Sequence, residues 1–453
     1  MTRFVTLLAL AALTLAVSSA HAAGHGRDAD QIATTTPIKH VIYLMQENHS
    51  FDNYFGTYPG ASGVPNGICM PRRPGQPQLG CVRPFHIGNR AVRDLSHSQK
   101  TFRREFRGGR MDGFVSAFGH GDSISMGHYD DRDIPFYWNI ADRYVLFDRF
   151  FTSAAGGSVW NHLYWVTGTP GNWRDDVIPP GGFGRLPTIF DRLDAKRIPW
   201  KFYVQNYDPT VTFRQRGSGD RGSQVVWVPL LDYARFLDDP RLFGRIVDLE
   251  QFYDDLAHNR LPAVSYIAPS GASEHPPGSI QAGERFVRTL ITALMRSRAW
   301  KSTAFVWTYD DWGGWYDHIR PPRIDRMGYG FRAPALLVSA YARRGYVDST
   351  TLDFTSLLKF VEENWRLQPL AERDRKANSI ATAFDFTASP RPAEFTPPIR
   401  AVPAKPEPRR SIIYVAYTFA ALAAGLVITG AALASRRRRE AEAEAEAGAE
   451  VAS

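Results

Sequence analysis

The sequence predicts an α/β protein whose central sheet is covered by helices on both faces. Short apolar runs rich in β-branched and aromatic residues are typical of buried strands, and they occur at 41–45, 198–205, 304–309, 335–339 and the start of 263–277. Helical patterns alternate with them, at 99–107, from Pro135, at 284–296, and from a Thr355 cap to Trp365. This alternation indicates a sheet with helices on both sides.

Two of these strands end in side chains that suit a metal ion. The run at 41–45 leads into Glu47 and Asn48, and the run at 304–309 leads into Asp310 and Asp311. Ligands of open α/β sheets bind at the carboxyl ends of the strands. Adjacent carboxylates repel each other unless a cation lies between them. The sequence therefore predicts one shared metal site formed by these four residues.

The donor set narrows the choice of metal without deciding it. Carboxylate and amide oxygens without cysteine favour a hard or borderline divalent ion, namely Ca²⁺, Mg²⁺, Mn²⁺ or Zn²⁺. The acidic run at 130–133 could also bind a cation, but we interpret it as a solvated entry to the helix that begins at Pro135.

Ser158 is the candidate nucleophile. It follows Gly156 and Gly157, which permit a tight turn, and it stands at the first turn of a predicted helix that continues through Tyr164. A serine there can simply cap the helix. It can also attack phosphorus, because helix amides stabilise a phosphoryl group and a nearby metal lowers the pKa of the hydroxyl.

Three histidines lie in predicted loops. His97 follows a Pro/Gly-rich segment, where a histidine is ordinarily a surface residue. His275 precedes two prolines at the end of a strand, so it is well placed to protonate a leaving group, and a structural loop role competes with this one. His318 follows the second strand end, and a site role and a structural role fit it about equally.

The two ends of the chain predict export and a membrane anchor. Residues 1–22 have the charge, apolar run and small-residue cleavage pattern of a signal peptide. Residues 411–435 contain an apolar run long enough to span a bilayer, and the arginines at 436–439 favour the cytoplasmic side for the carboxyl-terminal residues. We therefore expect a globular domain at 23–386 on the extracellular face, a proline-rich stalk at 387–410 and a cytoplasmic tail at 436–453.

The two cysteines, Cys69 and Cys81, are close together in a Pro/Gly-rich loop. Outside the cytoplasm such a pair ordinarily forms a disulfide, and a metal role would need further soft ligands nearby. Nucleic acid is not an expected partner, because the net charge of +8 is mild for a chain of 453 residues.

Four segments carry a family resemblance: ENHSFDNYFG, MGHYDDRDIPFYWNIADRYVLFDRFF, SGASEHPP and YDDWGGWYDHIRPP. In this order they resemble the bacterial phospholipase C and acid phosphatase family of phosphoesterases, over 38–386. The resemblance implies an alkaline-phosphatase-like, three-layer α/β/α sandwich for the domain at 23–386. It also implies that Ser158 forms a phosphoserine, and that His97 and His275 bind phosphoryl oxygens or assist the leaving group.

The segment after Ser158 matches the family in part. Family members carry an Asn-Arg/His-Leu-Tyr run there, and NHLY stands at 161–164, which makes Asn161 a possible substrate contact. Trp160 replaces the usual proline and Val159 replaces a large residue, so the shape of the pocket wall differs. Between 170 and 262 the sequence is largely loop, and insertions of this kind in an α/β enzyme commonly shape substrate access. We therefore expect substrate specificity to reside there, although the sequence does not identify which residues determine it.

The resemblance and the strand ends together predict a metal-dependent phosphoesterase. The first choice of substrate is a phosphatidylcholine-type phospholipid, whose quaternary ammonium group suits the aromatic-rich loops. The alternative is a surface acid phosphatase that acts on phosphomonoesters. A non-catalytic surface binding protein is the remoter alternative, because such a protein has no need of Glu47, Asn48, Ser158, Asp310 and Asp311 together.

Overall fold

The computed structural model describes residues 28–88, 90, 92–118, 123–217, 220–400, 429–431 and 433–436. The described residues from 28 to 400 belong to one compact unit, and those at 429–431 and 433–436 lie outside it. The predicted signal peptide, and most of the predicted membrane helix and cytoplasmic tail, lie outside the described residues. Among the helices that are described, none is long and apolar enough to cross a membrane.

An eight-stranded mixed sheet forms the centre of the first unit. Its order is β12-β6-β11-β10-β1-β9-β7-β8, and β11 runs antiparallel to its neighbours β10 and β6. The strands are β1 (His40–Gln46), β6 (Val145–Phe147), β7 (Trp200–Val204), β8 (Ile246–Asp248), β9 (Val264–Ala268), β10 (Thr303–Tyr309), β11 (Ala335–Ser339) and β12 (Tyr346–Asp348). The predicted strands are therefore confirmed, and β1 and β10 lie side by side at the centre.

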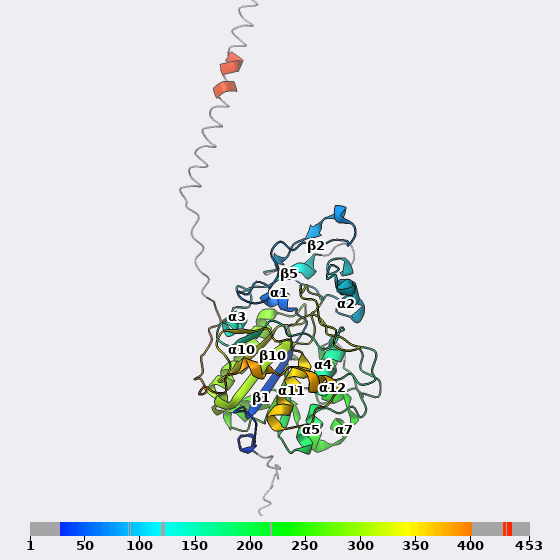
Figure 1. Ribbon diagram of the computed structural model, residues 1–453, viewed down its shortest axis with the longest axis vertical. Helices are drawn as coiled ribbons and strands as arrows, with labels where there is room; N and C mark the ends of the chain where they lie inside the picture. The colour runs from blue at the N-terminus through cyan, green and yellow to red at the C-terminus, as the bar shows by residue number, and fades with distance from the viewer. Residues whose placement is uncertain are drawn as a thin grey trace, which may run out of the picture. The chain divides into compact units, whose positions relative to one another are not determined.

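Helices cover both faces of the sheet (Figure 1). They are α1 (Phe51–Phe55), α2 (Gln99–Phe106), α3 (Pro135–Ala141), α4 (Ser158–Thr167), α5 (Ile189–Ala195), α6 (Asp220–Trp227), α7 (Ala234–Asp238), α8 (Pro240–Phe243), α9 (Glu250–Ala257), α10 (Ile280–Arg296), α11 (Phe354–Trp365) and α12 (Glu372–Lys376). The predicted cap of α11 is wrong: Asp353 caps the helix, and Thr355 lies inside its first turn.

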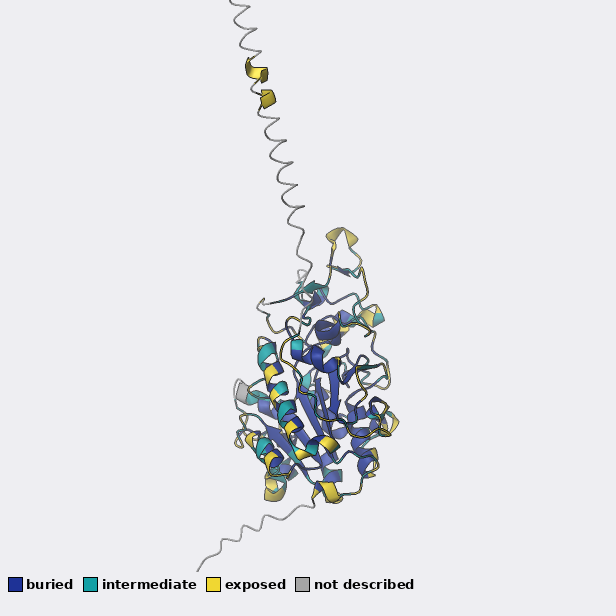
Figure 2. Ribbon diagram, turned by 90° about the vertical axis from the view of Figure 1, so that its left-hand side faces the viewer, coloured by how far each residue is buried: buried dark blue, intermediate teal, exposed yellow. Residues whose placement is uncertain are grey.

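The two faces of the sheet contact different helices because side chains alternate along a strand. Tyr43 of β1 donates a hydrogen bond to Leu357 O of α11 over 2.9 Å. Trp307 of β10 packs on Tyr137 of α3, with ring centroids 5.4 Å apart. Every residue of β1 and β10 is buried, as the dark strands in Figure 2 show. This sheet is the core that holds the strand ends in place.

A smaller region covers the carboxyl end of the sheet. It contains the two-residue strands β2 (Met70–Pro71), β3 (Cys81–Val82), β4 (Phe85–His86) and β5 (Gly127–His128). Figure 1 shows β2, β5 and α2 beyond the end of the sheet where α1 lies. The disulfide between Cys69 and Cys81 is confirmed, with Cα atoms 5.4 Å apart beside the β2–β3 pair.

Residues 387–400, the first part of the predicted stalk, lie against the domain rather than standing off it. Asn139 donates to the carbonyl oxygens of Pro397 and Ile399 over 3.1 and 3.0 Å. Arg400 forms an ion pair with Asp142 over 2.6 Å. The difference arises because an extended proline-rich segment leaves its carbonyl oxygens free to accept hydrogen bonds from the domain.

Candidate active site

The predicted metal ligands meet because of the strand register. Gln46 of β1 pairs with Tyr309 of β10, so the next residues of the two chain segments lie beside each other. Asp310 N donates to Gln46 O over 3.0 Å, and Asn48 N donates to Asp310 Oδ1 over 3.0 Å. The four predicted ligands are all buried. The structure thus brings Glu47, Asn48, Asp310 and Asp311 together in the interior.

The turn after Asp311 depends on a glycine. Gly313 has φ of +62°, a left-handed conformation that costs other residues energy. A Cβ atom on Gly313 would also lie 2.2 Å from Asn48 O. This close approach lets the segment that follows β10 pack on the segment that follows β1, where Asn48 has φ of +63°.

The side chain of Asn48 tests whether a cation fits here. Its amide oxygen faces Asp310 Oδ1 and Asp311 Oδ1 at 3.1 and 3.2 Å. Three oxygens this close repel one another unless a cation lies among them or the amide is turned. With the amide turned, its nitrogen donates to both carboxylates and its oxygen accepts from His275 Nε2 over 2.7 Å. In that orientation the amide itself satisfies the two carboxylates, so the fit for a divalent ion rests on the buried carboxylates of Glu47, Asp310 and Asp311.

The protonation of these carboxylates supports the same interpretation. Burial and the charge of Asp310 raise the pKa of Glu47 well above its usual value. Burial and Asp310 likewise raise the pKa of Asp311. Asp310 Oδ2 is buried and has no hydrogen-bond partner among the described residues. A bound cation would oppose these shifts, because its positive charge stabilises the ionised carboxylates.

His162 belongs to the same cluster, and the sequence analysis did not find it. Its Nε2 lies 2.9 Å from Glu47 Oε1 and 4.0 Å from Asp310 Oδ2. Burial lowers the pKa of His162 to about 4, which keeps the ring neutral and able to donate a lone pair. The signal was its position four residues after Ser158, on the same side of one helix.

Ser158 faces the predicted metal ligands rather than capping its helix. The cap of α4 is Gly157, so the simple capping interpretation of Ser158 is wrong. Ser158 Oγ donates to Asp311 Oδ2 over 3.4 Å. The hydroxyl therefore lies beside the predicted ligands, where a nucleophile would need to be.

Asp176 accepts hydrogen bonds from backbone amides at the start of α4. Its carboxylate accepts hydrogen bonds from Gly157 N over 2.6 Å and from Trp160 N over 2.8 Å. Burial raises the pKa of Asp176, and these two amides oppose the rise. The expectation that the helix amides bind a phosphoryl group is therefore wrong for these two amides. Asp176 comes from the 170–262 region, where the sequence predicts substrate specificity without identifying a residue.

The two possible substrate-binding residues have structural partners instead. Asn161 is buried, accepts from Ala154 N over 2.8 Å, and donates to the carbonyl oxygens of Gly156 and Gly157. It thus braces the turn before Ser158. His318 lies 2.7 Å from Asp52 Oδ2 through its Nδ1 and does not line the cavity that contains Ser158.

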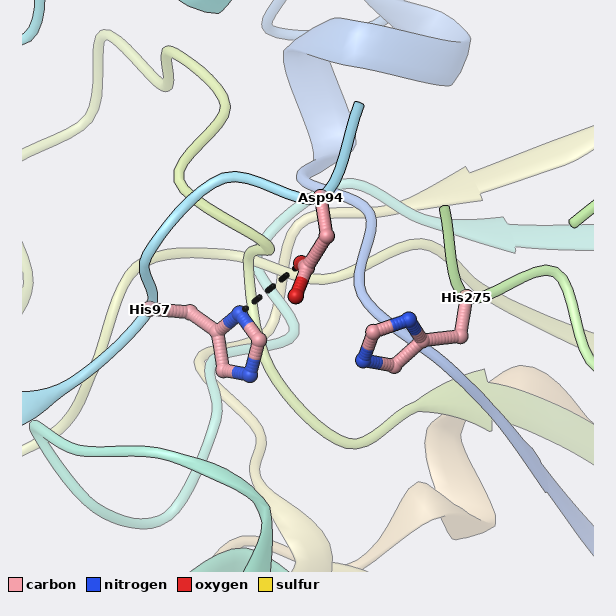
Figure 3. Close-up of side chains that lie close together, drawn as sticks. All are labelled: Asp94, His97 and His275. Atoms are coloured by element: carbon pink, nitrogen blue, oxygen red, sulfur yellow. Dashed lines mark ion pairs between the residues drawn. The ribbon is translucent and has the colours of Figure 1, made fainter. Parts of the chain in front are cut away.

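His97 and His275 come from distant segments, and their rings lie close together in an edge-to-face arrangement. Their ring centroids are 5.7 Å apart, and Asp94 Oδ1 lies 3.6 Å from His97 Nδ1 (Figure 3). The Nδ1 of His275 lies 2.8 Å from Pro276 O, which orients its Nε2 towards the cluster. Burial lowers the pKa of His275, but Glu47 and Pro276 O outweigh burial and raise it above the usual value. His275 is thus suited to donate a proton.

A cavity of ≈ 1060 Å³ opens onto these groups. Its described lining residues are Glu47, Asp94, Ser96, His97, Ser98, Gly157, Ser158, Val159, Asp176, Ser223, Val226, Trp227, Ser270, Gly271, Ala272, Ser273, His275, Pro276, Pro277, Gly278, Ser279 and Ala282. None of these is lysine or arginine. The cavity therefore offers serine hydroxyls, acidic groups and two histidines around Ser158.

Comparisons with known proteins agree with this chemistry. A model of the Phosphoesterase family matches residues 38–368. Phospholipase C B of Mycobacterium tuberculosis is 27% identical over 442 residues, which cover 82% of this chain and 83% of that protein. The non-hemolytic phospholipase C of Burkholderia pseudomallei is 27% identical, and the match covers 78% of this chain and 60% of that protein.

Solved structures show a weaker similarity. A protein in the alkaline phosphatase superfamily from Vibrio parahaemolyticus is 12% identical, with a TM-score of 0.35, and the match covers 72% of this chain and 65% of that one. The family assignment rests on the family model, which spans most of the domain and includes the strand ends, Ser158 and His275. The chain belongs to the Phosphoesterase family.

Proposed function

We propose that this protein is a metal-dependent phosphodiesterase of the phospholipase C type, which cleaves a phospholipid into diacylglycerol and a phosphorylated head group. The observation that carries the proposal is the position of Ser158 Oγ, 3.4 Å from Asp311 Oδ2 beside the buried carboxylate cluster. The names of the bacterial relatives support the choice of substrate.

In the proposed mechanism Ser158 Oγ attacks phosphorus and passes its proton to the carboxylate of Asp311, which it faces. The bond from phosphorus to the diacylglycerol oxygen breaks, and His275 Nε2 protonates that oxygen. The head group stays on Ser158 as a phosphodiester, which water then hydrolyses. A divalent ion held by Glu47, Asn48, Asp310 and Asp311 would neutralise the charge of the phosphoryl group.

The charges of the cavity support a phosphodiester substrate over a phosphomonoester. A phosphomonoester carries nearly two negative charges at neutral pH, and a phosphodiester carries one. The described lining residues include Asp94 and Asp176 but no lysine or arginine. A cavity of this kind favours the less charged ester, because each additional negative charge needs a compensating cation.

The aromatic loops do not form the cage that a choline group was expected to find. Tyr137 and Trp138 of the aromatic-rich segment are buried in the core. Trp227 is the one tryptophan, tyrosine or phenylalanine among the described lining residues of the cavity. We propose that Trp227 and Asp94 together contact a cationic head group, since an indole face and a carboxylate both attract an ammonium ion.

We also propose that the protein works outside the cytoplasm, attached through the apolar segment at 411–435. The Cys69–Cys81 disulfide supports this proposal, because disulfides persist in oxidising compartments.

A substrate panel tests the proposed function. The purified protein is given an aryl phosphocholine diester and the matching aryl phosphate, which share one leaving group. We expect kcat/KM for the diester to exceed that for the monoester. A monoester preference of about tenfold or more, equivalent to roughly 1.4 kcal/mol, would move the assignment to an acid phosphatase.

A further inference from the structure

We propose that Asp176 is the residue that makes this enzyme select phosphodiesters over phosphomonoesters. The inference rests on the proposed function and goes further by naming the side chain that discriminates. Asp176 lies in the 170–262 region, where the sequence predicts substrate specificity without identifying a residue. It belongs neither to the predicted metal ligands nor to the proposed chemical steps.

The position of Asp176 places a fixed negative charge beside the nucleophile. Its Oδ2 accepts from Gly157 N and its Oδ1 accepts from Trp160 N, the residues on either side of Ser158 and Val159. Its carboxylate also lines the same cavity as Ser158. A Cβ atom on Gly157 would lie 2.6 Å from Asp176 Oδ2, so the carboxylate packs directly on the backbone.

The carboxylate discriminates in two ways. It repels a second negative charge on the phosphoryl group, which a phosphomonoester has and a phosphodiester lacks. It also occupies two amides that could otherwise donate to the third non-bridging oxygen of a phosphomonoester. None of the described lining residues is a lysine or arginine that could offset the second negative charge.

Paired variants separate charge from structure. Asp176→Asn removes the charge and keeps one oxygen for the helix amides, whereas Asp176→Glu keeps the charge. Glu250→Gln is the matched control, because it removes a carboxylate from the exposed first turn of α9, outside the cavity. Each variant is assayed with the aryl phosphocholine diester and the aryl phosphate, and its thermal unfolding is recorded.

We expect Asp176→Asn to raise the ratio of monoester to diester kcat/KM about tenfold, because the repulsion acts on the more highly charged substrate. Asp176→Glu and Glu250→Gln should leave the ratio close to that of the unmodified enzyme. An unchanged ratio in Asp176→Asn, or an equal loss of both activities in the Asn and Glu variants, overturns the inference and leaves the proposed function standing.

A measurement on the unmodified enzyme keeps the inference testable if Asp176→Asn does not fold. An aryl methylphosphonate has the size of the aryl phosphate and carries one negative charge. We expect faster cleavage of the methylphosphonate than of the phosphate, because Asp176 repels the second negative charge of the phosphate and does not discriminate by size. Faster cleavage of the phosphate contradicts the inference, and an enzyme that cleaves none of the three esters contradicts the proposed function as well.

Discussion

His162 and Glu47 form a buried contact of 2.9 Å between Nε2 and Oε1, although 115 residues separate them in the chain. Glu47 comes from the end of β1 and His162 from α4, the helix that begins at Ser158. The contact therefore ties the predicted nucleophile helix to the predicted metal ligands. Each side chain exposes only 1% of its surface. Removing one partner would leave the other buried without its contact, which destabilises a protein.

Removing the Ser158 hydroxyl should abolish turnover while the protein still folds. Ser158→Ala deletes the oxygen that would attack phosphorus, so we expect less than a few per cent of the original kcat, which is a loss of about 10² or more. When reactions of the wild-type enzyme are stopped and analysed by mass spectrometry, the peptide that contains Ser158 should carry the phosphoryl head group. The corresponding peptide of the alanine variant should not. Substantial turnover by the alanine variant would rule out a phosphoserine.

Asp310→Asn and Glu47→Gln should each lose bound metal and activity together. Both changes remove a buried carboxylate from the oxygen cluster, and the neutral amide is a weaker ligand for a hard ion. Metal content of the purified variants, measured by elemental analysis, is the readout. Stoichiometric metal in the double variant would place the ligands elsewhere.

His162→Gln should weaken metal binding less than loss of a carboxylate does. If the ring orients Glu47, its removal should lower metal affinity about 10- to 100-fold. Titration of the metal-depleted protein with Zn²⁺ and Mn²⁺, followed by calorimetry, gives the affinity independently of turnover. An unchanged affinity would show that the contact with Glu47 has no part in holding the ion.

Truncation after Pro403 should preserve the stability of the domain, whereas truncation after Phe386 should lower it. A protein that ends at Pro403 keeps the contacts of residues 387–400 and should be active and soluble. A protein that ends at Phe386 loses the hydrogen bonds of Asn139, the Trp300–Arg391 bond and the Arg400–Asp142 pair. We expect it to unfold at a temperature several degrees lower, since several interactions are lost and about 1 kcal/mol shifts Tm by roughly 1–2 °C in a domain of this size. Equal Tm values would show that the segment contributes nothing.

Stability should fall as pH rises from about 5 to 9 because of Glu362. Burial and a hydrogen bond with Asp374 raise the pKa of Glu362 from 4.5 to about 9. Its stabilising contribution is therefore complete below pH 4.5, the unfolded value, and is lost as pH rises through the folded value of about 9.

Glu362→Gln tests this dependence far from the chemistry, since Glu362 lies on α11 and does not line the catalytic cavity. The neutral amide cannot lose a proton, so the variant should be more stable than the unmodified protein at pH 8 and similar at pH 5. Denaturant unfolding at both values is the measurement. A parallel fall in stability for both proteins would assign the pH dependence to another group.

The sequence by itself predicted five of the eight strands of the central sheet, the alternation of strands with helices, the disulfide, and the meeting of the residues that follow β1 and β10. Local patterns suffice for these features, because a buried strand needs an apolar run and a nearby cysteine pair needs only a short loop. Glu47 and Asp310 could be paired from sequence because both directly follow apolar strands, and parallel strands end at the same edge of a sheet.

The tertiary structure alone decided which polar groups meet across the fold. Asp176 reaches the amides of Gly157 and Trp160, and Asn161 turns inward to the Gly156–Gly157 turn instead of towards a substrate. His318 binds Asp52, and residues 387–400 pack on the domain. These partners are set by how loops pack on the finished sheet, and no local period or propensity encodes them, because each contact joins chain segments whose distance depends on the whole fold.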